Sequence, residues 1–518
     1  MTAITSSRNL GWAFACCAGI LSVAAPAFAA PQRLSREALL DKIRGGWAGQ
    51  MIGVAYGAKT EFKANAKIGD WELTWKPGML ENTIHQDDLY VEMTFAKVMD
   101  DQGLNATCEQ YGEAFKDSKY GLWHANAGAR RVLNQGIKAP LSGHPKYNFH
   151  ANDIDFQIEA DFIGLMCPGL PRESNKYCDR VGRVMNYGDG LYGGMFVCGM
   201  YSAAFLESDP RKVVAAGLAC IPRKSEYALL IQDLLEWSAA HPGDWRKVWQ
   251  LVEDKWDKND PCPAGAMAPF NIDAKINGAY IAFGLLFGGN NFEKVMEIST
   301  RCGQDSDCNP SSAAGVLGVM LGYGRIPEPF KADLPSLENR RFDFTEYSFN
   351  EIVKSTEARA LQVIQQTGGK VTDSEVLIAV QKPKAPKLEQ WSPGIPEARL
   401  KASDPAFSFS GSWEADKDAR LSSQGGNEVT LTFQGVAVAI MGNLGQYGGR
   451  AEVFLDGKKV GIADSYIVER TNDKVLWNTY GLKPGKHTVR LVTSNDADPR
   501  SKGKRLSIQE AVIYRAAK

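Results

Sequence analysis

The spacing of apolar residues divides the chain into a helical part and a strand-rich part. From about residue 35 to residue 366, apolar positions recur every three or four residues, as on one face of a helix. The clearest helical segments are residues 35–57, 88–99, 192–207, 227–240 and 279–288. Alternating β-branched runs are scarce there, so this part is predicted to be mostly α-helical.

Further along the chain the apolar period changes to two. Short alternating runs occupy residues 407–410, 429–433, 436–441, 450–455, 487–493 and 507–514. Asp456-Gly457 directly follows one of them, and Asp-Gly between apolar runs is a strong hairpin signal. Several short strands at regular spacing predict a β-sandwich.

These patterns predict a multidomain protein with four segments. They are a signal peptide over residues 1–29, an all-α domain over 33–370, a Pro- and Lys-rich linker over 381–400, and an all-β sandwich over 401–518. Arg8, the apolar run 10–24 and Ala27-Phe28-Ala29 are typical of a secretory signal. We therefore expect a secreted or periplasmic protein. No later run is long and apolar enough to span a bilayer, so we expect no stable membrane association.

Composition excludes some functions and leaves the cysteines open. A net charge of -1 argues against a protein that coats nucleic acid. There are ten cysteines and no CxxC, which excludes zinc-ribbon and thioredoxin-type sites. In an oxidising compartment Cys167 could pair with Cys178, and Cys302 with Cys308. The sequence leaves both pairings undecided.

Four glycines form a stripe on the first predicted helix. Gly45, Gly49, Gly53 and Gly57 recur every four residues and therefore share one face. Each glycine costs a helix about 1 kcal/mol relative to alanine. The stripe indicates either that another backbone packs closely there or that the helix breaks towards its end.

Two acidic pairs each open a helical segment. Asp87 and Asp88 precede one, and Asp305 and Asp307 precede another. Acidic residues in a first helical turn are common, since they stabilise the helix by about 0.3–1 kcal/mol. Four carboxylates that converge would instead require a cation, and hard divalent ions prefer oxygen ligands. Glu61, where the glycine-striped helix ends, offers another oxygen.

Four segments, 49–62, 85–95, 187–196 and 302–315, occur in the order and spacing of the ADP-ribosylglycohydrolase family. The chain resembles that family over roughly residues 36–330. The resemblance implies an all-α fold with a central cleft that holds one or two divalent cations. It also implies hydrolysis of a glycosidic bond at the anomeric carbon of an ADP-ribosyl group. We expect Mg²⁺, with Mn²⁺ or Ca²⁺ as alternatives.

The resemblance also assigns roles to individual residues. The implied metal ligands are Asp87, Asp88, Asp305 and Asp307, with Gln86 and Cys308 at two positions where the family usually has threonine. The catalytic candidates are Glu61, which matches a glutamate near the scissile bond, Asp88 and Asp305. Val54 replaces an acidic residue of the family, so one of two metal sites is expected to be altered or absent.

Five residues are candidates for binding substrate. Gly188, Asp189 and Gly190 match the family's glycine-rich loop that approaches the ribose, although Asp189 stands where asparagine is frequent. His124 is a candidate substrate contact. Trp71 is a candidate sugar platform, although loop tryptophans more often pack at the edge of a core.

The resulting hypothesis is a secreted, metal-dependent glycoside hydrolase that acts on a ribosyl- or furanosyl-type substrate in a glycan. The predicted sandwich resembles the jelly-roll carbohydrate-binding modules of secreted glycoside hydrolases, although it could simply buttress the first domain. One alternative is a true ADP-ribosyl hydrolase that acts on modified protein or nucleotide. The other is a non-catalytic carbohydrate-binding protein with a degenerated site. The expected partner is a carbohydrate or ribosylated substrate, and not nucleic acid.

Overall fold

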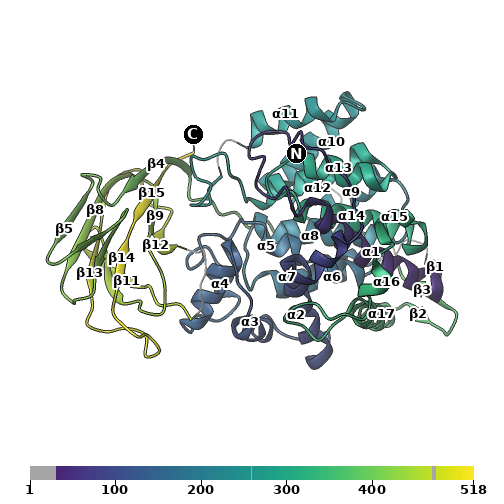
Figure 1. The fold of residues 1–518 in the computed structure, drawn as a ribbon, viewed down its shortest axis with the longest axis horizontal. Coiled ribbons are helices and arrows are strands. Elements are labelled where there is room, and N and C mark those ends of the chain that lie inside the picture. The colour runs from purple at the N-terminus through teal and green to yellow at the C-terminus, as the bar shows by residue number, and fades with distance from the viewer. Residues whose placement is uncertain (1–30, 258–259, 469–473, 518) are drawn as a thin grey trace, which may run out of the picture.

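A computed structural model describes residues 31–257, 260–468 and 474–517 of the chain. A helical part and a β-sheet part lie side by side along the longest axis of the molecule (Figure 1). The multidomain prediction of an all-α region followed by an all-β region is therefore confirmed. Within the described ranges, no helix combines the length and the apolar character that crossing a membrane requires.

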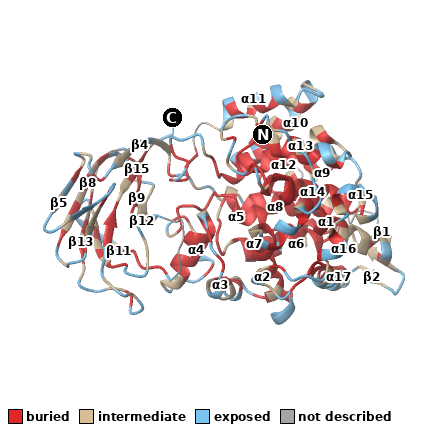
Figure 2. Ribbon diagram, viewed as in Figure 1, coloured by how far each residue is buried: buried red, intermediate tan, exposed pale blue. Residues whose placement is uncertain are grey.

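The first part is built almost entirely from helices. They are α1 (Arg36–Gly57), α2 (Asp87–Gln102), α3 (Cys108–Asp117), α4 (His124–Asn134), α5 (Asp155–Ile158), α6 (Asp161–Leu165), α7 (Pro171–Gly182), α8 (Asp189–Ala204), α9 (Pro210–Leu218), α10 (Glu226–Ala240), α11 (Trp245–Trp256), α12 (Ala274–Gly288), α13 (Phe292–Arg301), α14 (Cys308–Leu321), α15 (Glu328–Lys331), α16 (Leu334–Leu337) and α17 (Phe349–Gln366). Short 3-10 helices cover Met79–His85, Leu141–Gly143 and Tyr323–Arg325. Buried residues concentrate on the central helices α1, α8, α12 and α14 (Figure 2).

The strands form four antiparallel sheets. They are β1 (Gln32–Ser35), β2 (Lys370–Val371), β3 (Glu375–Ile378), β4 (Ile395–Lys401), β5 (Phe407–Ser410), β6 (Glu414–Asp416), β7 (Ala419–Ser422), β8 (Glu428–Gly435), β9 (Ala437–Met441), β10 (Arg450–Leu455), β11 (Lys458–Asp464), β12 (Val475–Thr479), β13 (Gly485–Thr493), β14 (Leu506–Ile508) and β15 (Glu510–Arg515). The sheet orders are β1-β3-β2, β11-β10-β13-β8-β5, β12-β9-β15-β4 and β14-β7-β6. The hairpin predicted at Asp456-Gly457 joins β10 to β11.

The glycine stripe of α1 packs against the backbone of α14. The helix begins as its sequence indicates, because the Ser35 hydroxyl accepts a hydrogen bond from the Ala38 amide at 3.0 Å. A Cβ atom placed on Gly49 would lie 2.2 Å from the Ala314 carbonyl oxygen. Only glycine permits so close an approach, and α1 continues unbroken to Gly57. The first explanation of the stripe, a closely packed backbone, is confirmed.

The sheet β12-β9-β15-β4 is buried on both faces. In β9, Val438 and Ile440 pack in the core between this sheet and the five-stranded sheet. Ala439 and Met441, which point the other way, pack in a cluster that includes Phe149 of the helical part. Burial on both faces explains why β9 is apolar at every position. The sandwich is therefore joined to the helical part by an apolar interface.

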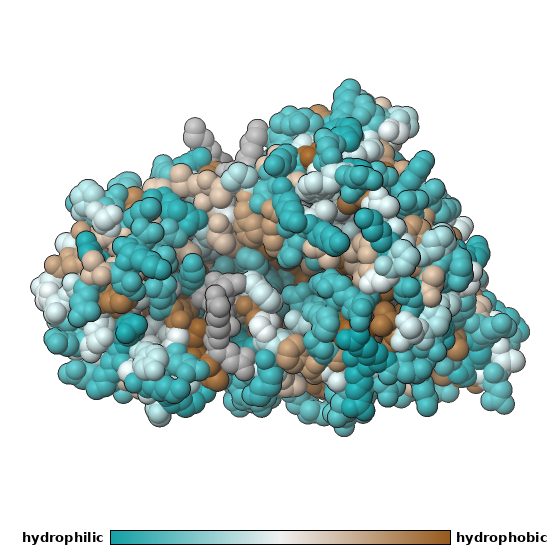
Figure 3. Space-filling view, in the orientation of Figure 1, coloured by the Kyte–Doolittle hydropathy of each residue, from teal (hydrophilic) through white to brown (hydrophobic). Residues whose placement is uncertain are grey.

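The segment expected to be a linker, 381–400, differs from that expectation. Glu389 pairs at 3.0 Å with Arg183, the residue that follows α7, and the Trp391 ring lies edge-on to Phe149 with centroids 5.5 Å apart. From Ile395 onward the segment is strand β4 of the sandwich. The sequence predicted a linker here because Phe149, the packing partner of Trp391, is distant in the sequence, so that no local pattern indicates the contact. In the space-filling view, apolar residues are visible in the middle of the molecule, between the two parts (Figure 3).

Candidate active site

A cavity of about 790 Å³ lies where the helical part meets the sandwich. The helical part lines it with acidic, aromatic and histidine side chains, among them Glu61, Gln86, Asp87, Tyr90, Trp123, His124, Phe270, Asp305 and Cys308. The sandwich contributes Arg399, Met441, Lys474 and Glu510. The second domain is thus a wall of the cavity.

The two acidic pairs converge at the floor of this cavity because α2 and α14 both begin there. Asp307 is the N-cap residue of α14, but its side chain makes no capping hydrogen bond. Ligand atoms of Asp305, Asp307 and Cys308 lie within 4.8 Å of one another. The Cys308 thiol also contacts Asp88 Oδ2 at 3.2 Å and so links the second pair to the first. Capping of a helix start therefore does not explain this arrangement.

Asp87, Asp88, Asp305 and Asp307 together are called the acidic floor. Three of their carboxylates are deeply buried, and hydrogen bonds satisfy them only in part. Asp88 is 2% exposed, and Asp305 and Asp307 are each 3% exposed. The Oδ1 atoms of Asp88 and Asp305 have no hydrogen-bond partner among the described residues. Burial, and then the neighbouring carboxylates, raise the pKa of all three side chains well above the usual range.

Glu61 lies at the rim of the cavity, in the loop after α1. Glu61 is an exposed residue that lines the cavity, and its partial burial, followed by the charges of Asp307 and Asp87, raises its pKa to about 8. The Thr60 and Ser306 hydroxyls share a hydrogen bond of 2.8 Å, which ties this loop to the acidic loop before α14. Glu61 therefore lies beside Asp87 and Asp307, two of the aspartates with which the sequence analysis placed it in one site.

The donor set fits a hard divalent cation. Buried carboxylate oxygens without partners leave an excess of negative charge, which such an ion would neutralise. Cys308, one of the implied ligands, lies with Asp305 and Asp307 in a single group of possible metal ligands. Burial and the surrounding aspartates raise the pKa of its thiol, which therefore keeps its proton and donates to Asp88. A protonated thiol is a poor ligand for magnesium.

Sequence reasoning missed two acidic residues behind Asp88. Glu92 accepts a hydrogen bond from the Phe162 amide at 2.8 Å, and Asp161 accepts one from Ser312 at 3.3 Å. Burial raises the pKa of Asp161 to about 7. Glu92 follows Asp88 by four residues on α2, a spacing that could have revealed it. Asp161 follows Glu159 by two residues, the same spacing as that of Asp305 and Asp307, and this spacing was the available signal.

Of the five candidate substrate residues, only His124 is among the residues that line the cavity. Gly190 packs against backbone instead, since a Cβ there would lie 2.3 Å from the Ala151 oxygen. Asp189 lines a separate cavity beside Lys275, and Gly188 packs near the Glu389 carbonyl. Trp71 lies elsewhere, and its carbonyl accepts a hydrogen bond from Arg301 at 2.9 Å. Trp123, which is 42% exposed, is the tryptophan that lines the cavity.

Neither cysteine pair considered from the sequence forms a disulfide. Cys167, Cys178, Cys302 and Cys308 are all free thiols. Cys302 and Cys308 lie on opposite sides of the acidic loop, at the end of α13 and the start of α14. The acidic loop is thus held by packing and hydrogen bonds.

Comparisons with known proteins find one family and several partial similarities. A family model described as ADP-ribosylglycohydrolase matches residues 35–362. An "ADP-ribosylglycohydrolase-related protein complex" of known structure is 16% identical, and the match covers 62% of this chain and 98% of that chain with a TM-score of 0.41. A family 35 carbohydrate binding module from an environmental isolate is 16% identical over 24% of this chain and 100% of its own, with a TM-score of 0.16.

One curated relative is an A type blood N-acetyl-alpha-D-galactosamine deacetylase of Flavonifractor plautii. It is 32% identical over 96 residues, which are 17% of this chain and 12% of that protein. The chain therefore matches only a small share of that relative. The family model, in contrast, spans more than half of the chain and includes both acidic pairs, so the protein belongs to the ADP-ribosylglycohydrolase family, a family of hydrolases.

Proposed function

We propose that this protein is an exported, metal-dependent glycoside hydrolase that cleaves a ribosyl- or furanosyl-type unit from a glycan. The observation that carries the proposal is the set of buried carboxylates Asp88, Asp305 and Asp307, of which Asp305 lines the cavity and the other two lie beside it. Burying such charges is strongly unfavourable unless something compensates them. The cavity volume of about 790 Å³ is within the usual range for small-molecule sites.

Mg²⁺ is the proposed ion, held by Asp87, Asp88, Asp305 and Asp307. Bound there, one or two such ions would supply a Lewis acid that orients sugar hydroxyls and lowers the pKa of a bound water. Mn²⁺ and Ca²⁺ share the preference for oxygen and are the alternatives.

Glu61 is the proposed base. Its carboxylate lies beside the acidic floor, where it would position the attacking water and take its proton. Burial and the neighbouring aspartates raise its pKa in the metal-free protein, and a divalent cation bound beside it would lower that pKa and keep the carboxylate ionised. Attack by the water oxygen on the anomeric carbon breaks the bond of that carbon to the leaving oxygen, which takes up a proton from solvent, while positive charge develops on the sugar ring.

Three features support a glycan as the substrate. The predicted export signal would place the protein outside the cytoplasm, and the sandwich forms one wall of the cavity through residues such as Met441. Trp123 and Phe270 give the cavity aromatic surfaces against which the apolar face of a sugar can pack. The curated relative is named for a reaction on a glycan, which is consistent with this setting.

A substrate panel tests the proposal. Wild type, Glu61→Gln, Asp305→Asn and the matched control Asp70→Asn would be incubated with Mg²⁺ and furanosides, oligosaccharides or ADP-ribosylated protein. Asp70 is an exposed residue that pairs with Arg246, and it is not among the residues that line the cavity. We expect sugar release by wild type and the control, with a loss of about 10²-fold or more in Glu61→Gln.

Other outcomes would replace the proposal. Release of ADP-ribose alone would identify an ADP-ribosyl hydrolase. Tight glycan binding without product on prolonged incubation would identify a carbohydrate-binding protein. Full activity in Asp305→Asn would show that the acidic floor takes no part in the reaction.

A further inference from the structure

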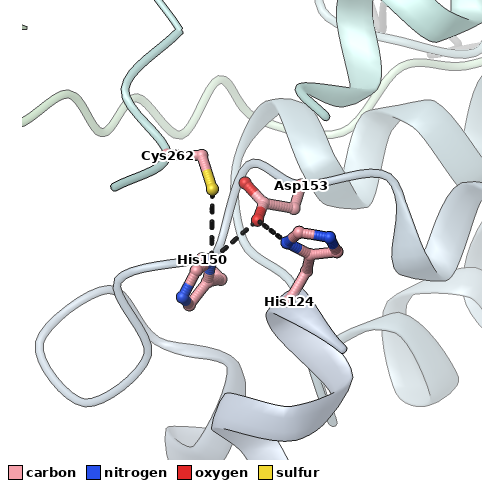
Figure 4. A group of neighbouring side chains, drawn as sticks. All are labelled: His124, His150, Asp153 and Cys262. Atoms are coloured by element: carbon pink, nitrogen blue, oxygen red, sulfur yellow. Dashed lines mark hydrogen bonds and ion pairs between the residues drawn. The ribbon is translucent and has the colours of Figure 1, made fainter. Parts of the chain in front are cut away.

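A second cluster of potential metal ligands lies beside the cavity, apart from the acidic floor. It consists of His124 at the start of α4, His150 and Asp153 in the loop before α5, and Cys262 in the loop between α11 and α12. Their ligand atoms all lie within 4.8 Å of one another (Figure 4). Three segments that are distant in sequence thus meet at one point.

Two of the separations in the cluster match those of a tetrahedral site. His124 Nδ1 lies 3.6 Å from Asp153 Oδ2, and Cys262 Sγ lies 3.4 Å from His150 Nδ1. Zinc bonds of about 2.0–2.3 Å place neighbouring ligand atoms about 3.3–3.6 Å apart. A third separation, His150 Nδ1 to Asp153 Oδ2 at 2.8 Å, would open by about half an ångström on metal binding, and the other pairs of ligand atoms lie within 4.8 Å.

The same geometry argues against a nucleophilic cysteine. In a nucleophile–histidine–carboxylate relay, the nucleophile and the carboxylate contact opposite nitrogens of the imidazole ring. Here Cys262 and Asp153 both approach Nδ1 of His150. The ring therefore cannot pass a proton from one to the other. Convergence on one point is, in contrast, what metal ligation requires.

The backbone at His124 is an independent sign of a built site. Its φ of 43° is in the left-handed region, which costs a non-glycine residue about 1–3 kcal/mol. The strained backbone directs the ring towards the cluster, where it stacks on Phe270 at 5.8 Å and lies edge-on to His150 at 5.9 Å. Such strain persists where the surroundings hold the residue in place.

We propose that His124, His150, Asp153 and Cys262 form a closed structural zinc site. Two imidazoles and a thiolate favour zinc over the hard ions suited to the acidic floor. Binding would release the thiol proton of Cys262 to solvent. All four protein ligands would be used, so the ion holds structure rather than activating water.

The site would hold in place the loop between α11 and α12, which contacts the sandwich. Next to Cys262, the Pro261 carbonyl accepts a hydrogen bond from Tyr514 of the sandwich at 2.8 Å. The Ala266 carbonyl accepts one from Arg399, which lines the cavity, at 3.2 Å. A zinc ion on Cys262 would therefore fix both the interface and one wall of the cavity.

Metal analysis of the full mature chain tests this proposal. After loading with Zn²⁺ and gel filtration with a weak chelator, we expect about one equivalent of tightly held zinc. With Co²⁺ in its place, a thiolate-to-cobalt absorption band should appear in the near ultraviolet. Both should be lost in Cys262→Ser and His150→Ala. The controls Cys108→Ser and Cys308→Ser should keep them, because neither thiol belongs to the cluster.

The contradicting results are equally defined. Zinc that is retained by Cys262→Ser but lost from Asp305→Asn would place the ion in the acidic floor and overturn the proposal. If the Cys262 and His150 variants do not fold, the wild type still decides. Folded wild type that retains less than about a tenth of an equivalent of zinc, and shows no cobalt band, would overturn it.

Discussion

The packing of α1 on α14 should control the acidic floor, and Gly57→Ala tests this directly. Gly57 is the last residue of α1. A Cβ atom there would lie 2.1 Å from the Ser306 carbonyl oxygen and 2.5 Å from the Asp307 Cα atom. Both neighbours are backbone atoms, so no side-chain rotation can relieve the contact. The acidic loop itself must move.

The size of the effect follows from these distances. Restoring an ordinary contact of 3.4 Å to the Ser306 oxygen requires a shift of about 1 Å in the acidic loop. Overpacking of this kind destabilises a protein by about 1–3 kcal/mol. A displacement of about 1 Å can also reduce turnover about 10²-fold. We therefore expect a modestly lower unfolding midpoint together with a large loss of cation affinity and activity.

Calorimetric titration with Mg²⁺ and thermal unfolding measure the two effects separately. Gly46→Ala is the matched control, because it makes the same change on the same helix. Its added methyl would meet the side-chain atoms Leu165 Cδ2 and Val319 Cγ2, which can rotate away. Cation binding should stay near the wild-type value there. Wild-type cation affinity in Gly57→Ala would refute the proposed coupling.

Three further predictions concern charge, the interface and the substrate residues. Because Glu61 has its pKa raised from 4.5 to about 8, the folded metal-free protein holds a proton that the unfolded chain has lost. The unfolding midpoint of chelated protein should therefore fall as pH rises from about 4.5 to 8, and a rising midpoint would contradict the sign. Phe149→Ala should lower the free energy of unfolding by about 3–5 kcal/mol and make the sandwich more susceptible to limited proteolysis, because it removes an aromatic ring from the apolar interface. An unchanged free energy of unfolding and an unchanged cleavage pattern would contradict an apolar interface. Trp71→Ala should leave turnover unchanged whereas Trp123→Ala lowers it, and the reverse order would restore the original platform assignment.

The fold classes were predictable from sequence because periodicity is local. Each helix such as α2 and each strand such as β8 carries its own apolar pattern. The small sheet was not predictable, because β1 pairs with β3 across almost the whole helical part. The packing of the expected linker against the helical part was not predictable either, since the Phe149 partner of Trp391 is distant in sequence. Apolar residues at every position of β9 were the available sign of a second buried face.

The candidate site was predictable only where its residues are neighbours in sequence. Each acidic pair is a local feature, and the resemblance to the ADP-ribosylglycohydrolase family indicated that the two pairs belong to one site. Asp161 and Cys262 each have an acidic residue two positions earlier in the sequence, but only the fold brings them to the other polar groups of their sites. The choice of Trp123 over Trp71 likewise depends on which loop faces the cavity. Local pattern contains no information on such contacts.

The central claim is that a divalent cation occupies the acidic floor. Wild type and Asp305→Asn would be stripped with EDTA and melted after separate addition of Mg²⁺, Mn²⁺ and Ca²⁺. An ion that binds only the folded state stabilises it by about 2.7 kcal/mol at a hundred times its Kd. The account predicts a metal-specific rise in the wild-type midpoint that disappears in Asp305→Asn. Equal midpoints with and without every metal, in protein shown by mass spectrometry to be metal-free, would contradict it.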